Sequence, residues 1–197
     1  MANQDAAFGL RPLKTVGQQD DSTGMSSYNI SPGDASVIFQ GSLVGSPATG
    51  TGYVDLQTAG LVLNLGAFWG TFYNDPTTLK PTFKNYYPGS ITPPNSGAIE
   101  AFVYDSPAQM YEIQSDNTGA SAQADIFKCA DLAGVSGSTL NGVSSMELGD
   151  ATLGTTGQFK IIGVSRDPEN NDIGSANVNW RVMLNESLLG SGTAGAA

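Results

Sequence analysis

Side chains that carry oxygen gather in one short segment, and they are the first candidates for chemistry. Asp167, Glu169 and Asn171 stand at alternate positions, the spacing at which carboxylate and amide oxygens bind calcium in loop sites. Such a loop continues with a glycine and closes with a glutamate, but Asp172 and Val178 stand at those positions here. Asn and Asp also form turns by bonding to their own backbone. We favour the solvated turn, and we expect no metal and no cofactor.

The composition removes most other catalytic chemistry. The chain has no histidine and a single cysteine, Cys129, which excludes Ser-His and Cys-His nucleophiles, thiolate metal clusters and an internal disulfide. A pair of carboxylates could still hydrolyse a glycosidic bond. No pattern selects among the candidates for such a pair, which are Asp20, Asp21, Asp55, Asp75, Glu100, Glu112 and Glu147. We therefore expect a binding or structural protein and not an enzyme.

The charge balance argues against nucleic acid and membranes as partners. The chain has 18 acidic and 8 basic residues, a formal net charge of −10, and no basic cluster. No segment reaches the run of about 18 apolar residues that a membrane helix needs. Residues 1–5 lack the basic start and apolar stretch of a secretion signal. We expect a protein made in the cytoplasm that binds neither nucleic acid nor membrane.

The elements that must position any site are β-strands. Residues 155–168 and 177–185 alternate apolar and polar side chains, and turn residues bound both segments. Phe159 and Ile161 fall on one face of the first strand, and Trp180 shares a face with the apolar residues of the second. The two strands either pair directly, as a hairpin with a long loop, or face each other across a sandwich.

Short strands separated by turns dominate the rest of the chain. Residues 98–104 and 109–114 flank a turn at 105–107, which predicts a hairpin. Residues 121–133 are the one helix candidate, and a strand through 125–132 is the competing interpretation. The pattern predicts an all-β fold, a sandwich or a jelly-roll or other barrel, with an extended N-terminal arm and at most one short helix.

The chain divides into three regions. Residues 1–27 are polar with a few apolar anchors, which predicts an extended arm that docks on its own body or on a neighbour. Residues 28–189 form a single β domain, and we expect the small-residue tail 190–197 to be mobile. Because few lysines are available to protect strand edges, we expect arms or partner subunits to cover some of those edges.

The segment 74–97 is long, irregular and rich in proline. Segments of this length are usually functional or disordered, and the aromatic residues argue against disorder. The favoured interpretation is that Phe83, Tyr86 and Tyr87 pack the segment onto its own sheet. The alternative is that these rings form a platform for a ligand such as a sugar.

Several segments of the sequence are similar to those of a known class of protein. They are MANQDAAFGLRP (1–12), QMYEIQ (109–114), VSSMEL (143–148), FKIIGVSRDPEN (159–170), Ile173-Gly174 and Trp180-Arg181-Val182. In these segments the chain resembles capsid cement (decoration) proteins of short-tailed, podovirus-like tailed phages. The likeness runs over most of the chain and is weakest over 74–97.

The resemblance implies a virion structural protein on the capsid exterior. Such proteins form β-rich trimers that staple neighbouring major capsid subunits, so the implied partners are the major capsid protein and further copies of this chain in a homotrimer. The alternative is a tail or head fibre, a virion module that binds carbohydrate. The candidate contact residues are Phe8, Leu10, Arg11, Pro12, Leu13, Phe83, Tyr86 and Tyr87.

Overall fold

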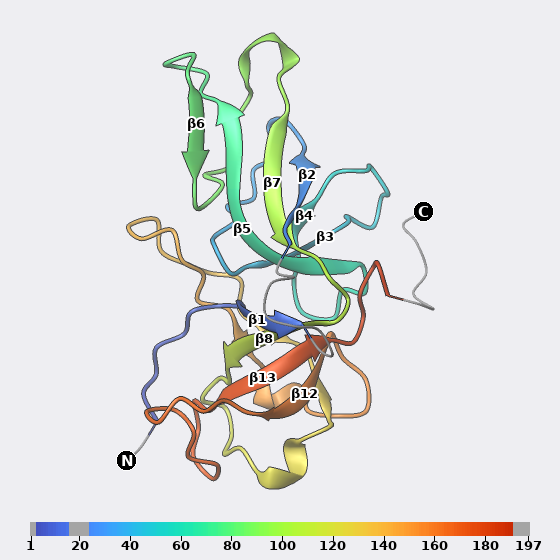
Figure 1. The fold of residues 1–197 in the computed structure, drawn as a ribbon, viewed down its shortest axis with the longest axis vertical. Helices are drawn as coiled ribbons and strands as arrows, with labels where there is room; N and C mark the ends of the chain where they lie inside the picture. The colour runs from blue at the N-terminus through green and yellow to red at the C-terminus, as the bar shows by residue number, and fades with distance from the viewer. Residues whose placement is uncertain (1–2, 16–23, 191–197) are drawn as a thin grey trace.

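The computed structural model describes residues 3–15 and 24–190, which form short, mostly antiparallel strands (Figure 1). The predicted all-β fold is confirmed. Helical structure in these two ranges is limited to three 3-10 turns, η1 (Pro94–Ser96), η2 (Gln123–Asp125) and η3 (Asp150–Thr152). None of the helices in this part of the chain is long and apolar enough to cross a membrane.

The lower sheet in Figure 1 combines strands from both ends of the chain. Its order is β1 (Arg11–Thr15), β8 (Gln109–Gln114), β13 (Asn179–Leu184), β12 (Phe159–Val164) and β9 (Cys129–Ala130). β12 and β13 pair antiparallel with Ile161 opposite Val182, so the direct pairing is the correct alternative. The predicted faces are also confirmed, since Phe159, Ile161, Trp180 and Val182 are all buried.

The upper sheet is built around one long strand, β5 (Asn64–Asn74). Its order is β2 (Ser26–Ile30), β7 (Ile99–Tyr104), β5, β3 (Leu43–Gly45) and β4 (Asp55–Leu56), and β6 (Pro81–Lys84) pairs with the far half of β5. The Val54 N–H donates to the carbonyl of Asn29 at 2.9 Å, which brings the chain beside β4 back to β2 and curls the sheet. A separate pair, β10 (Leu132–Ala133) and β11 (Glu147–Leu148), completes the strands.

The two sheets share one core where they meet. Leu43 and Ala67 of the upper sheet belong to the same buried cluster as Phe159 and Trp180 of the lower sheet. A second cluster, which includes Tyr73, fills the inside of the curled upper sheet. Beyond the junction, β6 and the adjoining parts of β5 and β7 project away from the lower sheet (Figure 1). In this projecting part, one face of the upper sheet covers the second cluster. The opposite face has no lower sheet packed against it.

The predicted hairpin of 98–104 with 109–114 is wrong. β7 belongs to the upper sheet and β8 to the lower, so the chain changes sheets between them. Both edges of β7 are occupied by β2 and β5, while β1 and β13 occupy those of β8. The hydroxyl of Tyr28 donates to Asp105 Oδ2 at 2.6 Å and holds the crossing segment against β2. Long-range pairing therefore replaces the local hairpin.

The helix candidate 121–133 is also wrong, and the strand interpretation is closer. Only the turn η2 forms, closed by a hydrogen bond from Ala122 N–H to Asp125 Oδ2. Phe127 then adopts a φ of 75°, which ends any helical continuation. Cys129 and Ala130 pair with β12, because this pairing buries their small side chains beside the core.

The region boundaries change in detail. Part of the predicted arm is built into the domain, since β1 is an edge strand of the lower sheet and Leu10 is buried. β2 begins at Ser26, inside the predicted arm, and β6 lies within the segment predicted to be irregular. Residues 16–23 of the predicted arm lie outside the described residues, and so do residues 191–197 of the tail that we expected to be mobile.

Candidate binding surface

A bulge in β5 aims Trp69 at the surface. Phe68 pairs with Val103 and Gly70 pairs with Phe102, so Trp69 is the extra residue between two matched pairs. Bulges of this kind bend a strand and redirect a side chain. Phe68 points into the core at 1% exposure, whereas Trp69 is 37% exposed. An indole with this much solvent contact is one of the few large apolar groups on the sheet face.

Beyond the bulge, three phenylalanines form what we call the aromatic face, namely Phe72, Phe83 and Phe102. Phe72 lies directly opposite Phe83 across β5 and β6, and the rings of Phe83 and Phe102 are 6.2 Å apart. The Phe83 ring lies over Gly70, where an added Cβ would come within 2.7 Å of it. Phe72 and Phe83 are 39% and 55% exposed. The projecting part therefore presents aromatic rings to solvent.

The aromatic face continues a face that is buried elsewhere. Ala67 and Tyr104 pair across β5 and β7 just below the bulge, and both pack against the core shared with the lower sheet. Strand alternation places Phe102 on the same face as Tyr104. Above the junction the lower sheet no longer covers this face (Figure 1). Uncovered apolar surface of this kind usually marks an interaction site.

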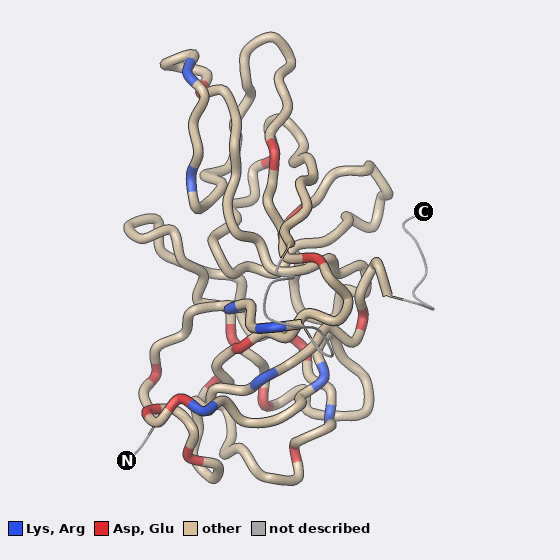
Figure 2. The backbone as a smooth tube through the Cα atoms, viewed as in Figure 1, with Lys and Arg blue, Asp and Glu red and all other residues tan. Residues whose placement is uncertain are grey.

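The free edge beside the aromatic face is protected against strand addition. β6 has four residues, begins with Pro81 and ends with Lys84. Lys80 directly precedes it. Short length, proline and lysine are the features that prevent an edge from pairing with another chain. Elsewhere the projecting part carries few charges (Figure 2). The geometry thus favours a partner that lies on the face over one that extends the sheet.

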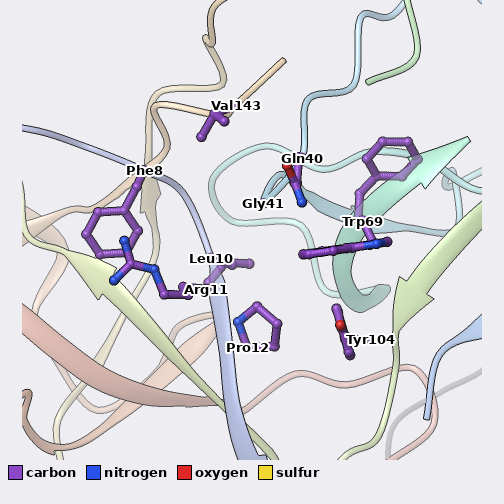
Figure 3. A pocket seen from close by; sticks show the side chains of 10 residues that line it. Phe8, Leu10, Arg11, Pro12, Gln40, Gly41, Trp69, Tyr104 and Val143 are labelled. Carbon is purple, nitrogen blue, oxygen red and sulfur yellow. The ribbon is translucent and has the colours of Figure 1, made fainter. Parts of the chain in front are cut away.

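Below the aromatic face, the N-terminal segment closes a second feature, which we call the Trp69 pocket. It is a cavity of about 320 Å³ with an apolar floor of Leu10 and Pro12. Trp69 lines one side, and the Phe8 ring with the Arg11 guanidinium lines another (Figure 3). Leu10 holds the segment in place, because its N–H donates to the carbonyl of Gly41 at 2.7 Å.

Polar groups surround this apolar pocket. Arg11 lies 4.1 Å above the centre of the Phe8 ring, and its Nη1 donates to Glu112 Oε2 at 2.9 Å. Gln40 accepts a hydrogen bond at Oε1 from Asn85 at 3.4 Å, which leaves its amide N–H groups available. Tyr104 packs edge-on to Trp69, with ring centres 5.7 Å apart. Burial raises the pKa of Tyr104, so its hydroxyl stays protonated at neutral pH.

The predicted contact residues fall into different places. Phe8, Leu10, Arg11 and Pro12 come together in the Trp69 pocket, and Phe83 lies on the aromatic face. Leu13 is half-buried in β1. The other two predicted contact residues, Tyr86 and Tyr87, lie apart from both features.

Tyr86 and Tyr87 pack the segment 74–97 onto the domain, as the favoured interpretation expected. Tyr86 stacks on Phe39 with ring centres 6.0 Å apart. Tyr87 is fully buried, and its hydroxyl donates to the carbonyl of Asp34 at 3.0 Å. A joint platform with Phe83 is therefore not assembled.

Sequence reasoning missed four residues of this surface, Trp69, Phe72, Phe102 and Tyr104. A signal was present, since residues 67–73 place aromatic side chains on both faces of one strand. A strand packed on both sides and a strand with one open face have the same pattern, however. The bulge that separates Trp69 from Phe68 leaves no mark in the composition.

The acidic segment 167–172 forms a turn that uses its own oxygens. Asp167 accepts from the Glu169 N–H at 3.1 Å and from the Asn179 side chain at 3.2 Å. Asp172 accepts from the Ser175 hydroxyl at 3.1 Å. No three acidic or thiol side chains within residues 3–15 and 24–190 are arranged to hold a metal ion. These local bonds agree with the turn interpretation.

A different group of carboxyls is perturbed near η3. Burial, together with the charge of Asp116 and Asp125, raises the pKa of Asp150 to about 7, and a polar contact with Ser115 offsets part of that rise. Both Asp150 oxygens lack a hydrogen bond of normal geometry within the described residues. Burial with Asp5 and Asp116 similarly raises the pKa of Glu147 to about 7. Above pH 7 the fold therefore carries buried like charges.

The repulsion between these buried like charges predicts that the protein becomes more stable as the pH falls from about 8 to about 5. The folded pKa of Asp150 exceeds its unfolded value of about 3.8, so the folded state binds more protons in this interval and unfolding becomes harder. Asp150→Asn should stabilise the fold by about 1 kcal/mol at pH 8, because the site is only partly buried, and by less than half of that at pH 5. Urea unfolding at both pH values measures this.

The matched control is Glu169→Gln, which changes an exposed carboxyl in the 167–172 turn. Its effect should be small and the same at both pH values. An Asp150→Asn gain that does not depend on pH would contradict the charge explanation.

Comparisons with known proteins add no family to this geometry. No family model, no curated protein and no solved structure matches the chain.

Proposed function

We propose that this protein is a capsid cement, or decoration, protein, which binds the outside of a phage head and staples neighbouring major capsid subunits. The aromatic face is the observation that carries the proposal, because it extends a core face beyond the sheet that covers it. The segments that resemble phage decoration proteins, and the expectation that the chain is not an enzyme, support the same conclusion.

The mechanism is avidity. A homotrimer presents three aromatic faces, and linked contacts strengthen one another because each later contact forms within one complex. Phe72 and Phe83 supply exposed aromatic area of the kind that dominates protein interfaces. The protected edge of β6 keeps the protein from pairing with other sheets through its backbone. The net charge of −10 helps to keep free copies soluble before they bind.

The test is binding to phage heads from which this protein has been removed. The double variant Phe72→Ser, Phe83→Ser should bind about ten-fold more weakly or worse, since it removes two rings from the contact. Co-sedimentation over a range of concentrations gives the affinity, and heating the heads gives their stability. Heads with the native protein should withstand higher temperature than heads without it.

The control variant is Leu140→Ser, which removes the most exposed apolar side chain of another loop, at 98% exposure. It should bind as the native protein does. Heads that are equally heat-stable with and without the protein, a few copies per particle, or a single copy by native mass spectrometry would each contradict the proposal.

A further inference from the structure

We infer that the Trp69 pocket binds a neutral saccharide. This function goes beyond attachment to a capsid, and it uses residues outside the aromatic face. The pocket is concave, has a volume of about 320 Å³ and lies at the lower end of the range of roughly 300–1,000 Å³ for small-molecule sites. That size suits one or two sugar rings.

The first requirement for a sugar site is an exposed ring with a fixed orientation. A pyranose has an apolar face of C–H groups, which packs against the electron-rich face of an aromatic ring. The β5 bulge aims Trp69 outward, and the Tyr104 ring meets it at 82°, which braces the indole. Trp69 is thus held ready for stacking at little cost in side-chain entropy.

The second requirement is a set of planar polar groups around that ring. Arg11 uses Nη1 for Glu112, and its other guanidinium N–H groups have no partner within the described residues. The described residues also offer no hydrogen-bond partner to the Gln40 amide N–H groups, the Trp69 Nε1–H or the Tyr104 hydroxyl. All four side chains line the pocket (Figure 3). Together they match the hydroxyl groups around a sugar ring, which both donate and accept.

The same groups argue against other ligands. Arg11 is already paired with Glu112 at 2.9 Å in a chain of net charge −10, so a phosphate or carboxylate finds no net positive charge. An apolar side chain of a partner would take water from Arg11, Gln40 and Tyr104 without replacing its hydrogen bonds, which is unfavourable. A neutral ligand with one apolar face and a polar rim fits both parts of the pocket.

The experiment titrates the full chain with three neutral probes, cellohexaose, maltohexaose and chitohexaose. Of the two tryptophans only Trp69 is exposed, since Trp180 is 1% exposed, so sugar stacking should change the fluorescence of Trp69. At least one probe should bind. Trp69→Ala should weaken that binding about ten-fold or more by calorimetry, and Arg11→Met several-fold.

Two controls separate this site from the capsid contact. The double variant Phe72→Ser, Phe83→Ser should still bind the sugar, and Trp69→Ala should still bind phage heads. Trp69→Ala should also keep the native melting temperature within a few degrees, because its indole is partly exposed. Three results would overturn the inference. No probe binds at about 10 mM, binding survives Trp69→Ala, or an apolar peptide binds the pocket more tightly than the sugar and displaces it.

Discussion

Replacing Gly66 with alanine should destabilise the fold by about 3 kcal/mol or more, although it adds a single methyl group. A Cβ at this position would lie 1.9 Å from the carbonyl oxygen of Tyr104 and 3.1 Å from the Cα of Asp105. Both are backbone atoms of the segment that leaves the upper sheet for the lower one. Because this segment also packs against the shared core, it cannot move away without disturbing both sheets.

The measurement is the free energy of unfolding from urea titration, with Gly24→Ala as the matched control. No atom of the described residues lies within 4 Å of the ideal Cβ position of Gly24, and its φ is not positive, so its substitution should change stability little. Equal stability of the two variants would show that the sheet-crossing segment adapts freely. In that case the close approach of β5 and Tyr104 would not be what fixes the crossing.

Gly66 also explains why the sequence predicts the wrong partner for residues 98–104. The turn at 105–107 is a sound local signal, and residues on both sides of it do form strands. Which edges are free depends on β2 and β5, which lie far away in the sequence. The missing side chain at Gly66 lets the backbone cross between the sheets. A local pattern contains neither fact.

Strands with one buried face could be predicted well. In β12 and β13 the apolar residues alternate cleanly, and Phe159, Ile161, Trp180 and Val182 are buried as expected. Short pairings were harder, because β9 and β10 have two residues each and follow no period. Because such short strands leave no alternating pattern, the spacing of small apolar residues in 121–133 resembled that of a helix. Pairing with β12 decides the structure instead.

The candidate binding surface could be predicted only in part. The apolar residues of the N-terminal segment stood out because they interrupt a polar stretch, and three of them, Phe8, Leu10 and Pro12, do line the Trp69 pocket. The opposite wall of the pocket depends on the one-residue bulge at Trp69. The aromatic face depends on the length by which β5 extends past the lower sheet. Neither property changes which residue types occur, so nothing in the sequence singled out Trp69 and Phe102.

Contact between the two sheets also depends on one buried amide, Gln158. Its Nε2 donates to the carbonyl of Thr58 at 2.9 Å and to Asn64 Oδ1 at 3.1 Å. Asn64 is the first residue of β5 in the upper sheet, and Thr58 follows β4 of the same sheet. Its Oε1 accepts from the Leu132 N–H at 3.1 Å, at the start of β10. Gln158 itself directly precedes β12 and is fully buried. A single side chain therefore satisfies two buried polar groups, the Leu132 N–H of β10 and Asn64 Oδ1 of β5.

Replacing Gln158 with leucine should destabilise the protein by about 3 kcal/mol, although the two side chains are similar in size. The substitution leaves the Leu132 N–H and Asn64 Oδ1 buried without a partner, and each such group costs about 1–3 kcal/mol. Gln123→Leu is the matched control, because Gln123 is exposed and its side chain makes no hydrogen bond with another described residue. Chemical denaturation of both variants measures the difference, and similar losses would contradict a role for the amide.

Gln158→Glu tests the same network through pH. Only the protonated carboxyl can donate, through its single O–H, to Asn64 Oδ1 or to the Thr58 carbonyl, so the folded state should raise the pKa of this glutamate above its unfolded value of about 4.3. Stability should then be close to native below the unfolded pKa and fall as the pH rises through the folded pKa. Gln158→Leu should remain equally destabilised throughout. A Gln158→Glu variant without this pH dependence would mean that water reaches the junction of the two sheets.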